Sequence, residues 1–86
     1  MSRTFELFHR IDDRPSAQVR RLVISAGLGD AVRFRNVGTS AEALGAMREL
    51  TGQEEVPALV VFAEGLREQV LVGEESIRAF VKELPK

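Results

Sequence analysis

The chain has 86 residues, which is room for one small hydrophobic core and one domain spanning residues 1–86. Hydrophobic residues make up 44% and charged residues 29%, a balance typical of folded globular proteins and unlike that of disordered chains. A net charge of −1 and the lack of any run of about 18 apolar residues argue against nucleic acid or a membrane as partner, and we expect a cytoplasmic protein.

The sequence contains no cysteine. This excludes a disulfide framework, a thiolate metal site and a thiol nucleophile. A domain this small is marginally stable without such cross-links, so a homodimer is one way in which it could gain stability. Charge is uneven along the chain, because residues 1–38 hold seven arginines and four acidic residues. This basic half could contribute to an anion site, although solvated surface is the simpler interpretation.

The chain is predicted to begin with a strand from Thr4 to His9. Phe5 and Leu7 alternate with Glu6 there, and Phe8 adds an apolar residue on the second side. A strand with apolar residues on both sides is typical of the interior of a sheet.

Turn formers and helix-start signals from Asp12 to Ser16 precede a predicted helix. Its apolar positions follow the i, i+3, i+4, i+7 spacing of one helical face: Val19, Leu22, Val23 and Ala26. Gly27 and Gly29 are expected to end it.

A second strand is predicted from Ala31 to Val37, in which Val32 and Phe34 face opposite to Arg33 and Arg35. Thr39 and Glu42 fit a capping box, in which each side chain satisfies a backbone donor of the other, and so predict the start of a second helix. The apolar face of this helix comprises Ala43, Leu44, Met47 and Leu50. The helix is expected to end near Gly52.

An unbroken apolar run from Ala58 to Ala63 predicts a buried strand. Glu64-Gly65 favours a tight turn into an antiparallel strand from Glu68 to Val72. After Gly73, the acidic pair Glu74-Glu75 suits the start of a helix. The apolar face of that last helix is Ile77, Phe80, Val81 and Leu84.

The element order β-α-β-α-β-β-α predicts an α/β fold with a mixed four-stranded sheet covered by three helices. The most continuously apolar strands, Thr4–His9 and Ala58–Ala63, should be central. The predicted core comprises Leu7, Leu22, Val23, Phe34, Leu50, Val60, Phe62, Ile77 and Phe80.

Two segments give the chain a resemblance to glutaredoxins, which have a thioredoxin-like fold, and to the amino-terminal domain of glutathione transferases. The run Thr51–Val61 resembles the family stretch in which a helix ends, a valine-proline pair follows and a strand begins. The resemblance implies a cis bond before Pro57. It also implies that the backbone of Val56 contacts an extended peptide or glutathione.

The second segment, Val72–Ile77, resembles the turn that holds the γ-glutamyl group of glutathione in both families. The resemblance implies ligand contacts at Gly73, Glu75 and Ser76, where helix amides favour a carboxylate and an acidic side chain can pair with an amine. The simpler interpretation is that Glu74 and Glu75 only complement the helix dipole.

The chain departs from the family at the start of the first helix. A redox member would carry a C-P-x-C motif there, and this chain has Arg14-Pro15-Ser16-Ala17. Thiol-disulfide exchange requires a thiolate, so this activity is excluded. An engineered chain with replaced cysteines would look the same. An alternative alignment places Ser16 near the catalytic serine of some glutathione transferases, although a helix-capping role is the more ordinary one for such a serine.

The remaining polar residues give weaker signals. His9 is the only histidine and has no second histidine or cysteine as a metal or catalytic partner, which favours a structural role. Asp12 and Asp13 are interpreted as helix caps rather than an acid/base pair.

The favoured hypothesis is a non-catalytic binding module for glutathione, a peptide or a protein partner, with Arg14 adding positive charge, no catalytic residue, no metal and no cofactor other than weakly bound glutathione. The alternatives are a glutathione-transferase-like enzyme that uses Ser16 and an assembly domain that forms a homodimer.

Overall fold

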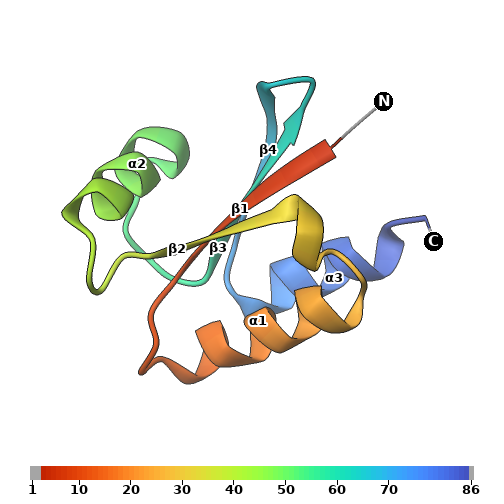
Figure 1. Cartoon of the computed structure of the whole chain (residues 1–86), viewed down its shortest axis with the longest axis horizontal. Coiled ribbons are helices and arrows are strands. Elements are labelled where there is room, and N and C mark those ends of the chain that lie inside the picture. Colours follow the sequence, from red (N-terminus) through yellow and green to blue (C-terminus); the bar gives the residue numbers. More distant parts are fainter. Residues whose placement is uncertain (1–2, 86) are drawn as a thin grey trace.

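The computed structural model describes residues 3–85 as one sheet with helices on both faces (Figure 1). The elements follow the predicted order, with one added 3-10 turn, η1. Their bounds are β1 Arg3–His9, α1 Arg14–Ser25, η1 Gly29–Ala31, β2 Val32–Asn36, α2 Ala41–Thr51, β3 Ala58–Ala63, β4 Leu66–Val72 and α3 Glu74–Glu83.

The strand order in the sheet is β2-β1-β3-β4. β1 pairs in parallel with β2 and antiparallel with β3, and β3 pairs antiparallel with β4. This confirms the predicted mixed sheet with β1 and β3 at its centre. The turn at Glu64-Gly65 has φ angles of 53° and 82°, the doubly positive combination that matches the twist of a tight hairpin.

Two apolar clusters lie on opposite faces of the sheet. α1 and α3 cover one face, and the cluster beneath them includes Leu7, Val23 and Ile77. α2 covers the other face, where Phe8 and Met47 are completely buried. Figure 1 shows α2 on one side of the sheet, with α1 and α3 together on the other. Both central strands are therefore buried from two sides, as their apolar runs predicted.

The predicted core is partly corrected by the structure. Leu7, Val23, Val60 and Ile77 are fully buried, as predicted. Leu22, Leu50, Phe62 and Phe80 are only partly buried around the two clusters. Phe34 is 37% exposed, so its assignment to the core was wrong. It lies on the edge strand β2, where alternation still sets the direction of the side chain but the helices do not fully cover it.

The start of α2 also differs from the prediction. Ser40, not Thr39, is the N-cap, and its hydroxyl accepts a hydrogen bond from the Ala43 amide at 3.1 Å. Because the residue three positions after Ser40 is an alanine, no reciprocal acidic side chain completes a capping box here. The predicted end is confirmed, since Gly52 follows the helix in a left-handed conformation.

Candidate functional site

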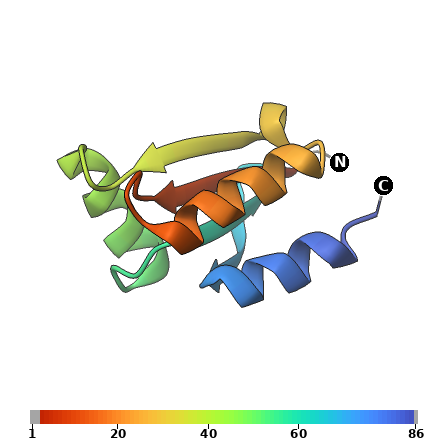
Figure 2. The ribbon, with the colours of Figure 1, turned by 90° about the horizontal axis from the view of Figure 1, so that it is seen from below.

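The candidate site lies at one end of the sheet, where three segments meet. α1 follows the end of β1, the loop 52–57 precedes the start of β3, and α3 follows the end of β4. Because β3 runs antiparallel to both β1 and β4, these three points fall at the same end of the strands. Figure 2 shows the start of α1, the loop before β3 and the start of α3 gathered at this end.

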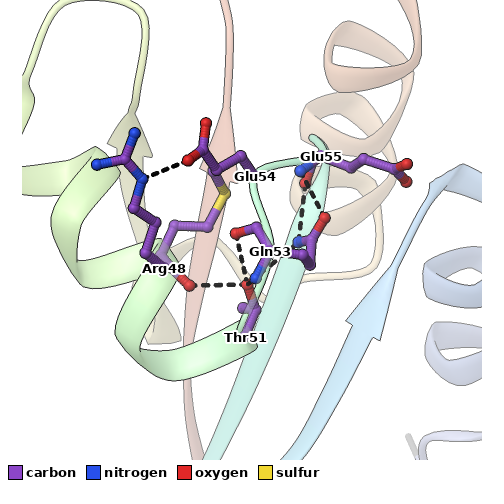
Figure 3. Close-up of polar contacts among 6 residues, drawn as sticks. Arg48, Thr51, Gln53, Glu54 and Glu55 are labelled. Atoms are coloured by element: carbon purple, nitrogen blue, oxygen red, sulfur yellow. Dashed lines mark hydrogen bonds and ion pairs between the residues drawn. The ribbon is translucent and has the colours of Figure 1, made fainter.

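The loop 52–57 is held by a network of short-range hydrogen bonds (Figure 3). The Thr51 hydroxyl donates to the Met47 carbonyl at 2.7 Å, and the Gln53 amide group donates to that hydroxyl at 3.1 Å. The Gln53 side chain also bonds both backbone groups of Glu55. Arg48 on α2 forms an ion pair with Glu54. These hydrogen bonds and the ion pair hold the backbone of the loop in one conformation up to Val56.

The Val56–Pro57 peptide bond is cis, and the Pro57 side chain is fully buried. The Pro57 carbonyl accepts a hydrogen bond from the Gly73 amide at 2.8 Å, which ties this loop to the start of α3. Within residues 3–85, no hydrogen bond uses the backbone N–H or C=O of Val56. Val56 is partly exposed, and its backbone donor and acceptor are without a hydrogen-bond partner among the described residues.

The start of α3 presents free backbone amides. Gly73 is the N-cap with a φ of 93°, a conformation that favours glycine, and it provides no side-chain cap. Glu74 pairs with Arg78 at 2.8 Å, so its charge is balanced within the helix. Glu75 and Ser76 are exposed, and their side chains carry no hydrogen bond within the described part of the chain. The turn therefore offers helix amides, one free carboxylate and one hydroxyl.

At the start of α1, Arg14 and Ser16 have different environments. Arg14 is the first helical residue and is exposed. Ser16 is completely buried, its hydroxyl donates to Asp13 Oδ2 at 2.8 Å, and it accepts from the Arg10 amide at 3.2 Å. Asp13 is the N-cap, as predicted, and also accepts from the Ser16 amide at 2.9 Å. The Ser16 hydroxyl is thus buried and already hydrogen-bonded to two groups of the protein itself.

A buried polar cluster beside the start of α1 was not predicted from the sequence. His9 is only 5% exposed, and its Nδ1 atom lies 3.0 Å from an Arg20 guanidinium nitrogen. The same nitrogen of Arg20 donates to the Arg10 carbonyl at 3.0 Å, and the Phe34 ring packs edge-on against His9. Burial, followed by the positive charge of Arg20, lowers the pKa of His9 from its usual value of 6.5. The structural role expected for His9 fits this arrangement.

The lowered pKa of His9 predicts a pH-dependent stability. The unfolded chain takes up a proton on this histidine at a higher pH than the folded chain does, so protonation favours unfolding. The stability that the fold gains from keeping His9 neutral is fully present above pH 6.5. It is lost as the pH falls towards the lower pKa of His9 in the folded state. We expect the thermal midpoint to fall between about pH 7 and 5.5, and to fall less in His9→Gln. Equal pH profiles for the two proteins would contradict the prediction.

Elsewhere the described residues 3–85 contain a larger hollow, and they lack a metal-binding cluster and a membrane-spanning helix. A hollow of about 730 Å³ lies between the far ends of α1 and α3, lined by Leu28, Val81 and Pro85 among others. The described residues contain no group of three or more histidine, cysteine, aspartate or glutamate side chains that could hold a metal ion. None of the helices in the described chain has the length and apolar character needed to cross a membrane.

Comparison with known proteins yields a fold and no family. No family model and no curated protein matches the chain. Solved structures do match it. An oxidoreductase-like structure described as having a thioredoxin fold is 15% identical with a TM-score of 0.72, over 96% of this chain and 80% of the other.

Two thioredoxins give similar results. That of Fasciola hepatica is 20% identical with a TM-score of 0.64, covering 93% of this chain and 78% of its own. A mutant thioredoxin from Halobacterium salinarum is 19% identical with a TM-score of 0.62, covering 98% of this chain and 78% of its own. The chain therefore has a thioredoxin-like fold, as predicted, while lacking every cysteine.

Proposed function

We propose that this domain is a non-catalytic binding module. It binds glutathione or an extended peptide at the end of the sheet formed by Val56, Pro57 and the turn at Gly73. The observation that supports it most directly is the pair of free backbone groups at Val56, next to a turn that presents free helix amides. The Gly73–Pro57 hydrogen bond keeps these two features in one fixed arrangement.

Each part of glutathione has a suitable counterpart at this end of the sheet. An extended cysteinyl unit can pair with the N–H and C=O of Val56, as a peptide pairs with the edge of a sheet. The γ-glutamyl carboxylate suits the amides at the start of α3, and its α-amine suits Glu75. Arg14 can hold the glycyl carboxylate, since a guanidinium grips a carboxylate through two parallel hydrogen bonds.

The absence of cysteine sets the strength and the character of binding. No mixed disulfide can form, so affinity depends on a few exposed polar contacts. A dissociation constant of about 1 mM, or about −4 kcal/mol, is expected on that basis. S-methylglutathione should bind about as well as glutathione, because no step uses the free thiol.

A titration followed by amide chemical shifts tests the proposal. Raising glutathione to about ten times the expected constant should move the signals of Val56 and of residues 73–77 in a saturable way. A dicarboxylate without an amine should bind more weakly, because Glu75 then repels it. If these signals stay fixed while the particle size rises with protein concentration, the domain is an assembly unit instead.

Glu75→Gln provides the sharpest change within the site. The substitution removes one exposed charge that would pair with the ligand amine, and we expect glutathione affinity to fall by about fivefold to tenfold. Glu83→Gln is the matched control, because it removes the same charge at the other end of the same helix. Equal glutathione affinities for the two variants would show that Glu75 does not contribute to ligand binding.

A further inference from the structure

We propose that the free edge of β2 is a second binding site, which accepts an extended segment of a partner protein with alternating acidic and apolar residues as a fifth strand. This site lies on the opposite edge of the sheet from β4 and is independent of the proposed glutathione site. Figure 2 shows β2 along the outer edge of the sheet.

The backbone of β2 is suitable for strand addition. All five residues from Val32 to Asn36 pair with β1 in an unbroken register. The Val37 amide donates to the His9 carbonyl at 3.0 Å, so residue 37 and, by alternation, residues 35 and 33 direct their backbone groups towards β1. Val32 and Phe34 therefore direct theirs outward. No hydrogen bond between described residues outside the sheet ladders occupies the outward groups of Phe34.

The other edge of the sheet is protected. The β3–β4 register is interrupted between Val61 and Phe62. The exposed half of β4 carries Arg67, which donates to the Leu50 carbonyl at 2.6 Å, and Glu68, which pairs with Arg3 at 3.3 Å. Irregular pairing and charged side chains are common ways to block edge-to-edge association. Of the two edge strands, only β2 combines regular pairing with its neighbour and an exposed aromatic side chain.

Side chains on the two faces of β2 specify the chemistry of the partner. On one face Phe34 is 37% exposed, and its ring packs edge-on against His9. This face suits apolar side chains. On the other face Arg35 is already paired with Glu6 at 2.7 Å. Arg33 is exposed and has no ion pair among residues 3–85, so it suits an acidic side chain directly opposite.

The same arginines argue against a second copy of the chain as the occupant. If two β2 strands paired antiparallel about a twofold axis with their sheet faces aligned, residues of the same face would be opposed. Registers centred on residue 33, 34 or 35 would then set Arg33 or Arg35 of one copy opposite an arginine of the other. Like charges directly opposite each other are destabilising. An acidic strand from a different protein avoids this conflict.

A capped peptide of seven residues that alternates valine and glutamate is the probe, and an otherwise identical valine-lysine peptide is its control. The glutamate peptide should shift the amide signals of residues 32–36 in a saturable way and bind at least about tenfold more tightly than the lysine peptide. N-methylation of the backbone amides that would face β2 should abolish binding, because it removes the hydrogen bonds of strand addition.

Two exposed substitutions complete the test. Arg33→Glu should reverse the preference between the two peptides, and Phe34→Ser should weaken binding of the glutamate peptide by about fivefold or more. Thermal unfolding checks that both variants remain folded. Equal binding of the two peptides, shifts confined to Val56 and residues 73–77, or dimerisation through β2 without peptide would overturn the proposal. Glutathione binding should be unchanged in both variants, which keeps this site separate from the first.

Discussion

Replacing Phe8 by alanine is expected to lower the free energy of unfolding by about 3 to 5 kcal/mol. Phe8 is completely buried in the cluster between the sheet and α2, together with residues such as Met47 and Val60. The Arg35 guanidinium also lies 5.6 Å from the centre of its ring. Alanine would leave a cavity in that cluster and remove this cation–π contact. For a small domain of marginal stability, a loss of this size would unfold much of the population.

Phe34→Ala is the matched control, because it deletes the same side chain from the neighbouring strand. Phe34 is 37% exposed, so its loss should cost no more than about 1 kcal/mol. Chemical denaturation of the two variants measures both values. A smaller loss for Phe8→Ala than for Phe34→Ala would contradict the assignment of core and edge.

The sequence predicted the elements well because each has a strong local signal. The run Ala58–Ala63 was placed with the bounds that the structure shows, since turn formers and a proline delimit it. The two central strands followed from their apolar residues on both sides. Phe34 shows where this reasoning stops. Alternation gives the face on which a side chain lies, but whether a helix covers that face depends on packing between distant segments.

The candidate site was predicted in part and for a different reason. The turn residues around Gly73 and the segment around Pro57 were recognised through their resemblance to glutaredoxins, and the structure brings these two segments together. The contact between His9 and Arg20 joins residues 11 positions apart through the geometry of β1 and α1. No periodicity or motif encodes such a pair. The burial of Ser16 depends likewise on how the loop after β1 folds back on the helix.

Ser16→Ala is expected to lower the free energy of unfolding by about 1 to 3 kcal/mol. The buried hydroxyl is the acceptor for the Arg10 amide and a donor to Asp13, which caps the helix. Alanine leaves both groups without this partner. Ser25→Ala is the matched control, because Ser25 is an exposed serine at the other end of α1 and should change stability by less than about 0.5 kcal/mol.

The same variant distinguishes a structural serine from a catalytic one. If Ser16 only supports the fold, Ser16→Ala should bind glutathione as the parent chain does at a temperature where both are folded. Neither protein should then conjugate a generic electrophile to glutathione above the uncatalysed rate. A transferase that uses this hydroxyl would show the reverse: turnover in the parent chain and its loss in Ser16→Ala, by more than the fraction of protein that unfolds. Since the hydroxyl already has a donor and an acceptor inside the protein, the first outcome is expected.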